Sequence, residues 1–175
     1  MDEIVARSLA KWPNVPAVYG WLSLDRRGNW LIRSTRATDR FERIGNAALR
    51  EFIGRNYQAD EKGRWYFQNG PQRVYVELEV APWVWRLGPG HSVTAHSGQP
   101  ARPGRCLMDE QGRLYLETDM GFGLVHTLDV EQAADAVEQG VWILEEVAAA
   151  DLPGRFGYVC SPAALRQAMP DAAKK

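Results

Sequence analysis

The chain has 175 residues, of which 45% are hydrophobic and 25% are charged, as in an ordinary globular protein. No apolar run approaches the roughly 20 residues that a membrane-spanning helix needs, and the N-terminal residues lack the pattern of a secretory signal peptide. The two cysteines, Cys106 and Cys160, form no disulfide framework by themselves. These features argue against a disordered or membrane-spanning chain and predict one cytoplasmic domain over residues 1–175.

The formal net charge of −1 conceals an uneven distribution of charge along the chain. Residues 1–108 carry a net charge of +6, residues 109–151 a net charge of −10, and residues 152–175 a net charge of +3. Such asymmetry can mark a basic face for an anionic partner, or halves that neutralise each other or self-associate. Neutralisation within the molecule is the favoured interpretation, because the total charge does not suggest a polyanionic ligand.

The N-terminal third predicts a mixture of helices and strands. Residues 2–11 have the apolar spacing of a short helix, and "AVYGWLSL" and "NWLIRS" predict strands on either side of Asp25–Gly28. Thr38 and Asp39, with Glu42, resemble a capping box that starts a helix ending near Gly45. The clearer helix is "AALREFIGRNY", with Leu49, Phe52 and Ile53 as its buried stripe.

The strongest strand signal lies in "RWYFQNGPQRVYVELEV". Two β-rich runs flank Asn69-Gly70, a dipeptide that suits a tight hairpin turn. "WVWRL" predicts a further strand. The segment 88–104 that follows is rich in Gly and Pro, and we expect it to form a loop with a short strand, "SVTAH", inside it. A division into two lobes, if the chain has one, is predicted there.

The C-terminal part repeats the hairpin pattern and then becomes helical. "RCLM", "RLYLET" and "GFGLVHT" predict strands, and Asp129 predicts the cap of a helix "VEQAADAVEQ" that buries Val130, Ala134 and Val137. "VWILEEV" and "RFGYVC" predict strands, and Ser161-Pro162 starts a last helix through Met169. The fold class is therefore α+β: a largely antiparallel sheet built from hairpins, with three to four helices packed on it.

The pattern D-x-x-G occurs three times, at Asp25–Gly28, Asp60–Gly63 and Asp109–Gly112. No P-loop accompanies it, and the acidic spacing of a calcium loop is absent, so a phosphate or calcium site is not indicated. Asp favours the first position of a type I turn, and Gly allows the left-handed conformation that closes it. We interpret all three copies as hairpin turns.

The chain has seven tryptophans, and two of them suggest a ligand surface. In an extended segment Trp83 and Trp85 point to the same side, where exposed rings stack on sugars or bases and buried rings pack in a core. Beside the long segment 88–104, they suggest a contact region of Trp83, Trp85, His91 and His96. The leading hypothesis is a non-catalytic binding or accessory protein for a small molecule or a protein.

The competing hypothesis is a small metal-assisted hydrolase that uses His91, His96, Asp119 and His126. Imidazole and carboxylate groups are the ligands and general bases of such enzymes, but the spacing matches no known metal motif. No nucleophile elbow or dinucleotide fingerprint is present, so we expect no cofactor.

Other partners have weaker signals. A run of arginines from Arg26 to Arg43 surrounds Trp30, yet acidic residues interrupt it and no nucleic-acid-binding signature appears, which argues against nucleic acid as a partner. A homo-oligomer held by the oppositely charged segments is a further possibility.

Two stretches, "RIGNAALREFIGRNYQADEKGRWYFQNGPQRVYVELEVAPWV" and "GLVHTLD…GRFGYVCSPAAL", resemble a group of bacterial proteins of similar length that have no assigned function. The resemblance covers most of the chain. It implies a stand-alone cytoplasmic protein and assigns no activity or site residue.

Overall fold

The structure is a computed structural model that describes residues 1–35 and 38–168. The chain divides into two compact units. The first unit comprises Met1–Leu24, Trp30–Glu79 and the chain from Tyr158, and the second comprises Asp25–Asn29 and Val80–Gly157. The segment 88–104, where the sequence suggests a division into lobes, lies inside the second unit.

The first unit contains a six-stranded sheet, sheet A, with the strand order β3-β2-β1-β6-β5-β4. Its strands are β1 (Val18–Leu24), β2 (Trp30–Thr35), β3 (Thr38–Arg43), β4 (Tyr57–Ala59), β5 (Trp65–Asn69) and β6 (Gln72–Leu78). Neighbouring strands are antiparallel except β1 and β6, which are parallel. Hairpins at β1–β2 and β4–β5–β6 thus meet in the middle of the sheet.

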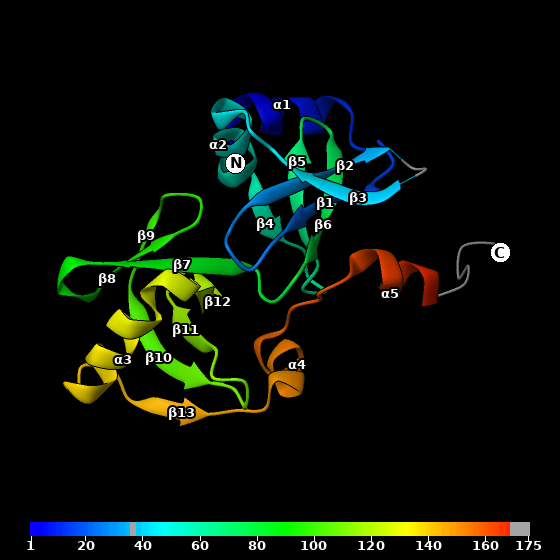
Figure 1. The fold of residues 1–175 in the computed structure, drawn as a ribbon. Coiled ribbons are helices and arrows are strands. Elements are labelled where there is room, and N and C mark those ends of the chain that lie inside the picture. The colour runs from blue at the N-terminus through cyan, green and yellow to red at the C-terminus, as the bar shows by residue number, and fades with distance from the viewer. Residues whose placement is uncertain (36–37, 169–175) are drawn as a thin grey trace. The chain divides into compact units, whose positions relative to one another are not determined.

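Three helices belong to the first unit: α1 (Glu3–Lys11), α2 (Ala47–Arg55) and α5 (Pro162–Ala168). The Asn46 side chain caps α2 by accepting a hydrogen bond from the Leu49 amide. Figure 1 shows α1 and α2 together on one side of sheet A, where Arg55 of α2 forms an ion pair with Asp2. Phe52 of α2 packs edge-on against Phe67 of β5, so this side of the sheet is the core.

The second unit contains a seven-stranded sheet, sheet B, with the order β13-β10-β11-β12-β7-β8-β9. Its strands are β7 (Trp83–Gly88), β8 (Ser92–Ala95), β9 (Pro100–Ala101), β10 (Pro103–Met108), β11 (Leu114–Thr118), β12 (Gly121–Val125) and β13 (Leu144–Glu146). The pairs β12–β7 and β10–β13 are parallel, and the other pairs are antiparallel.

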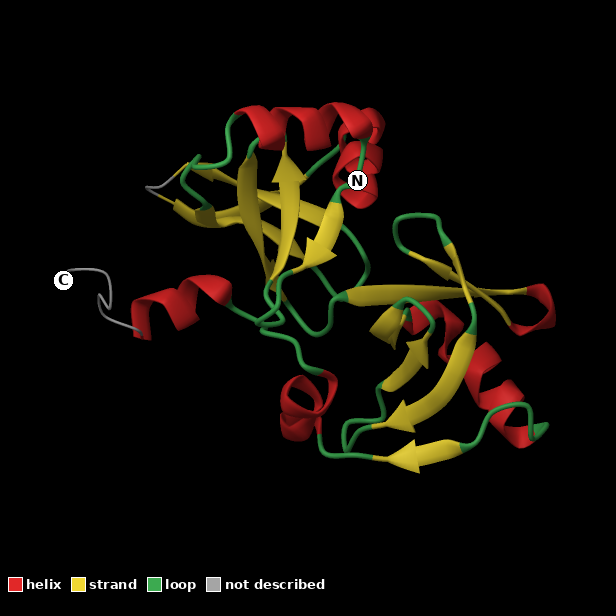
Figure 2. Ribbon diagram, turned by 180° about the vertical axis from the view of Figure 1, so that it is seen from behind, coloured by secondary structure: helices red, strands yellow, loops and turns green. Residues whose placement is uncertain are grey.

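The helices of the second unit are α3 (Val130–Glu138) and α4 (Leu152–Phe156), with 3-10 turns η1 (Pro89–His91), η2 (Thr127–Asp129) and η3 (Ala149–Asp151). Figure 2 shows α3 beside sheet B. The helix buries Ala133 and Ala136, whose small side chains allow close packing. Asp129 does not cap this helix with its side chain, because that carboxylate binds Arg86 and the Leu87 amide instead.

The predicted α+β class with a largely antiparallel, hairpin-built architecture is confirmed, although the strands form two sheets and the described residues contain five α-helices. Within those residues, no helix is both long enough and apolar enough to cross a membrane.

Two predicted elements are wrong. Residues 38–43 form strand β3 rather than a capped helix, because pairing with β2 places Phe41 opposite Arg33 and satisfies the backbone. "RFGYVC" is not a strand, since its first residues end α4. Pro153 in the first turn and Gly157 in the left-handed conformation after the last turn bound that helix.

Smaller corrections concern faces, turns and lengths. Leu49 is exposed on α2, and Ala134 is exposed on α3, whose buried face is shifted by one residue. In the β5–β6 hairpin Asn69 pairs with Gln72, so the two loop residues are Gly70 and Pro71 rather than Asn69-Gly70. The strand predicted over 141–147 is only β13, and the predicted helix end at Met169 lies outside the described residues.

The three D-x-x-G segments are hairpin turns, as predicted. In each, the Gly amide donates to the Asp carbonyl at 3.0 Å, and one carboxylate oxygen accepts from the amides two and four residues later. The three glycines have φ between +73° and +76°, the left-handed conformation that Gly adopts without strain. These turns join β1 to β2, β4 to β5 and β10 to β11.

Candidate functional site

Trp83 and Trp85 lie in the core of the second unit, where they are 5% and 0% exposed. Their rings stack with centroids 5.8 Å apart, and the Trp85 indole donates a hydrogen bond to the Leu116 carbonyl at 3.0 Å. A Cβ on Gly123 of β12 would lie 2.6 Å from Trp83, so sheet B is built closely around the pair. Their burial fits the core-packing interpretation, because a ligand could stack on these rings only if they left the core.

His96 is also a packing residue. Its Nδ1 accepts a hydrogen bond from the Val84 amide at 3.3 Å, and its ring lies 5.5 Å from that of Trp83. Burial lowers the pKa of His96 to about 3, so the imidazole is neutral at physiological pH.

The other residues of the hydrolase hypothesis each have contacts of their own. The His91 ring contacts Trp142, and Asp119 accepts hydrogen bonds from the backbone and side chain of Arg102. His126 Nδ1 accepts from the Leu128 amide at 3.1 Å, and burial, followed by the positive charge of Arg86, lowers the pKa of His126. Among residues 1–35 and 38–168, no three His, Cys, Asp or Glu side chains gather as metal ligands. The described residues therefore include no three-ligand metal site, and the acid–base role of these residues stays a prediction.

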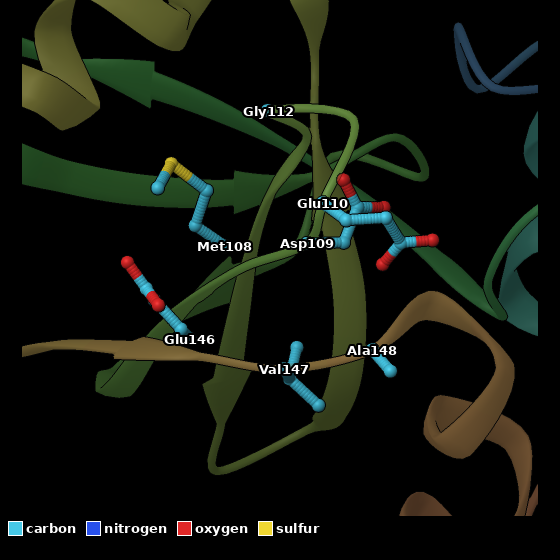
Figure 3. Close-up of a pocket in the computed structure, with 7 residues that line it drawn as sticks. All are labelled: Met108, Asp109, Glu110, Gly112, Glu146, Val147 and Ala148. Carbon is cyan, nitrogen blue, oxygen red and sulfur yellow. The ribbon is translucent and has the colours of Figure 1, made fainter.

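A pocket of about 710 Å³ in the second unit lies at the third D-x-x-G turn (Figure 3). Its lining residues are Met108, Asp109, Glu110, Gly112, Glu146, Val147 and Ala148. Figure 3 shows Met108 and Glu146 extending to the same side and Glu110 extending away from them.

Most of the polar groups in this pocket already have structural partners. Asp109 accepts from Arg113 and Tyr115, and Glu110 accepts from the Ala149 amide at 2.8 Å. Burial alone would raise the pKa of Asp109, but these hydrogen bonds from Arg113 and Tyr115 outweigh it and hold the pKa below its usual value. Asp109 stabilises the turn and Glu110 binds the Ala149 amide, so two of the three acidic residues that line this pocket already make structural contacts.

A smaller pocket of about 390 Å³ in the first unit has more suitable chemistry for binding. We call it the basic pocket, and it is lined by Tyr19, Gly20, Arg33, Ala163, Arg166 and Gln167. It forms at an irregularity of β1, where the register against β6 shifts between Val18 and Leu22. Gly20 has φ +72° within this bulge, and bulges commonly redirect side chains beside binding sites.

Two arginines bring positive charge to the basic pocket. The Arg166 guanidinium of α5 lies 4.7 Å from the centroid of the Tyr19 ring, and that of Arg33 on β2 lies 5.3 Å from the Phe41 ring. Contact with an aromatic face restricts the orientation of a guanidinium. Two guanidinium groups in one small pocket suit a carboxylate or a phosphate.

Acidic Glu77 fixes the helix that carries Arg166. Its carboxylate accepts hydrogen bonds from the Ser161 hydroxyl and, at 3.1 Å, from the Ala163 amide, which holds the start of α5 on β6. Tyr19 in turn stacks on Tyr75 of β6, with centroids 4.6 Å apart. The pocket wall is therefore held from both the helix and the sheet.

Few features of the sequence indicate this pocket. An isolated Gly inside a strand pattern is a signal for a bulge, which Gly20 turns out to occupy. Arg33 belongs to the run of arginines from Arg26 to Arg43, but no sequence pattern links it to Tyr19 or to the distant Arg166. Only the fold of α5 back onto β1 and β6 brings them together.

The comparisons with known proteins agree with the fold and assign no activity. The crystal structure of a DUF1285 family protein from Silicibacter pomeroyi DSS-3 is similar with a TM-score of 0.50 and 18% identity, over 77% of this chain and 84% of that chain. This likeness concerns the fold alone. No curated protein matches the chain.

The resemblance inferred from the sequence, to proteins with no assigned function, is confirmed by a family model. That model, DUF2944, is described as "Protein of unknown function (DUF2946)" and matches residues 1–163, so the chain belongs to this family.

Proposed function

We propose that the protein is a binding protein whose first unit takes an anionic ligand, bearing a carboxylate or phosphate group, in the basic pocket. The observation that carries the proposal is the pair Arg33 and Arg166, each placed against an aromatic ring at one cavity of about 390 Å³. The first unit also has 14 Lys and Arg against 10 Asp and Glu, a net charge of +4 that attracts anions.

The lining of the basic pocket favours binding over catalysis. Its polar side chains are two guanidiniums, a phenol and an amide, and its lining includes no His, Cys, Asp or Glu that would act as base or nucleophile. Guanidinium groups stay protonated at any physiological pH, so they hold an anion rather than transfer a proton.

A titration with tripolyphosphate at constant ionic strength tests the proposal. We expect saturable binding by calorimetry and a rise in melting temperature, because a ligand that binds the folded state stabilises it. Arg166→Gln keeps a polar side chain but shortens it and removes the charge, and we expect it to weaken binding at least about tenfold, as for a lost charge-assisted hydrogen bond.

The control is Arg7→Gln, which removes another exposed positive charge from α1 of the same unit, where Arg7 pairs with Glu3. We expect this variant to bind like the wild type. Equal affinity of wild type and Arg166→Gln would refute the assignment of the pocket, and equal weakening by both substitutions would show attraction by net charge alone.

A further inference from the structure

A second basic cavity lies in the first unit. This hairpin pocket, of about 420 Å³, is lined by Ala59, Asp60, Glu61, Lys62, Arg64, Tyr66 and Arg73. It gathers around the β4–β5 turn, and its ionisable side chains give a net charge of +1. Asp60 forms an ion pair with Arg64, in which the charged atoms are 2.6 Å apart. The other charged residues that line the pocket are the cations Lys62 and Arg73 and the carboxylate Glu61.

A row of tyrosines connects the two pockets along sheet A. Tyr19 stacks on Tyr75 with centroids 4.6 Å apart, and Tyr75 meets Tyr66 edge-on at 5.7 Å. Tyr66 and Tyr75 are also paired directly across β5 and β6, so their side chains share one face of the sheet. The Tyr19 and Tyr66 rings therefore lie within about 10 Å of each other.

The two ends of this row are built alike. Arg166 lies 4.7 Å from the Tyr19 centroid in the basic pocket, and Arg73 lies 4.7 Å from the Tyr66 centroid in the hairpin pocket. Each end thus presents a guanidinium held on a tyrosine, and the two guanidiniums are separated by at most about 20 Å. Two such groups at a fixed spacing are suited to one extended ligand rather than to a single small anion.

We propose that the ligand of the basic pocket is a linear phosphate polyanion that continues across the tyrosine row to Arg73 and Lys62. The inference rests on the proposed function and extends it from one anionic group to a chain of them. Tyr66 and Tyr75 are 5% and 2% exposed, so their faces are not open to stacking by nucleobases. This favours a polyphosphate chain over single-stranded nucleic acid, whose binding sites typically stack bases on aromatic rings.

The test compares tripolyphosphate, which is much shorter than the upper limit of about 20 Å between the two guanidiniums, with long-chain inorganic polyphosphate, using the full chain in both titrations. Joining two sites through one ligand raises affinity without new contacts, so we expect the long chain to bind at least about tenfold more tightly. A single-stranded oligothymidylate is the third probe, and we expect it to bind more weakly than long-chain polyphosphate.

A long chain offers many overlapping segments to one pocket and therefore binds more tightly even without bridging. The variant Arg73→Gln distinguishes this effect from bridging. We expect this variant to leave tripolyphosphate binding unchanged and to reduce long-chain binding to nearly the tripolyphosphate level, whereas Arg7→Gln should change neither. Near-UV circular dichroism of the aromatic side chains, unchanged between variants, verifies that the tertiary packing is retained.

The outcomes separate this inference from the proposed function. If tripolyphosphate binds through Arg166 but Arg73→Gln leaves long-chain binding intact, bridging is refuted and the proposed function stands. If tripolyphosphate does not bind, or binds regardless of Arg166, the proposed function fails first and the inference fails with it. Tighter binding of oligothymidylate than of polyphosphate would overturn the choice of ligand class.

Discussion

At the scale of single residues, the same turn is used three times with different surroundings. Asp60 and Asp109 each accept hydrogen bonds from an arginine four residues later and from a tyrosine, Tyr75 or Tyr115, whereas Asp25 uses Asn29 instead. The turn at Asp25–Asn29 belongs to the second unit, where Gly28 approaches His96. The same local sequence pattern therefore occurs in turns whose neighbouring side chains differ.

Gly28 and Gly112 test this difference directly. Both have positive φ, but a Cβ at Gly28 would lie 2.6 Å from the His96 Cβ, while one at Gly112 would meet nothing within 4 Å. Gly112→Ala should cost about 1–2 kcal/mol of unfolding free energy from backbone strain alone. Gly28→Ala adds a steric clash, for which overpacking costs a further 1–3 kcal/mol or so. Urea unfolding of both variants measures the difference, and equal losses would contradict it.

His96 predicts how stability depends on pH. Its pKa is about 3 in the folded protein against 6.5 ordinarily, so between these pH values the unfolded chain binds a proton that the folded protein does not. This residue therefore makes stability fall as pH falls through that window, by at most about 1.4 kcal/mol per pH unit. His96→Gln should be less stable at pH 7 but lose stability less steeply between pH 6.5 and 4. Parallel curves in a series of denaturant titrations would contradict this account.

At the scale of elements, strong local patterns predicted well and weak ones did not. The helix α1, the hairpins at the three turns and the strand β7 follow from apolar spacing and turn residues. The segment "TDRFER" satisfies a capping pattern locally and therefore predicts a helix, but it forms strand β3 by pairing with β2. For α4 the β-rich composition of "RFGYVC" predicts a strand, whereas Pro153 in the first turn and Gly157 after the last turn bound a helix.

The tryptophans of β7 give a prediction at this scale. Trp85 is fully buried and its indole N–H is hydrogen-bonded, so Trp85→Ala should lower the unfolding free energy by about 3–5 kcal/mol. Trp12→Ala is the control, since Trp12 is 58% exposed and should cost no more than about 0.5 kcal/mol, as for surface substitutions. Thermal unfolding measures this difference. A small loss of unfolding free energy for Trp85→Ala would contradict the core interpretation and favour a ligand surface.

At the scale of the whole molecule, charge follows the two units. The first unit carries +4, and the second, with 7 Lys and Arg against 12 Asp and Glu, carries −5. Along the sequence this imbalance of charge appears only as a basic, an acidic and a second basic segment, and these segments do not coincide with the two units. Self-association through the oppositely charged segments stays a prediction, and a monomeric mass in both low and high salt would rule it out.

The division of charge predicts where an anion acts. Tripolyphosphate should slow amide hydrogen exchange in β1 and β6, which carry Tyr19 and Tyr75, and leave the strands β10–β12 of the negatively charged second unit unchanged. Hydrogen exchange followed by mass spectrometry, with Arg166→Gln as control, measures this. Equal protection in both sheets would indicate a general salt effect.

The sequence by itself determined the α+β class, the hairpin turns and most strands, because these depend on turn chemistry and apolar periodicity within a few residues. Tertiary structure decided the rest. It buried Trp83 and Trp85, gathered no three metal-ligating side chains among the described residues, and brought Arg166 of the last helix to Tyr19 and Arg33 of the first hairpin. Such encounters depend on which strands pair and on where α5 returns to the sheet, and no spacing in a single sequence encodes those long-range contacts.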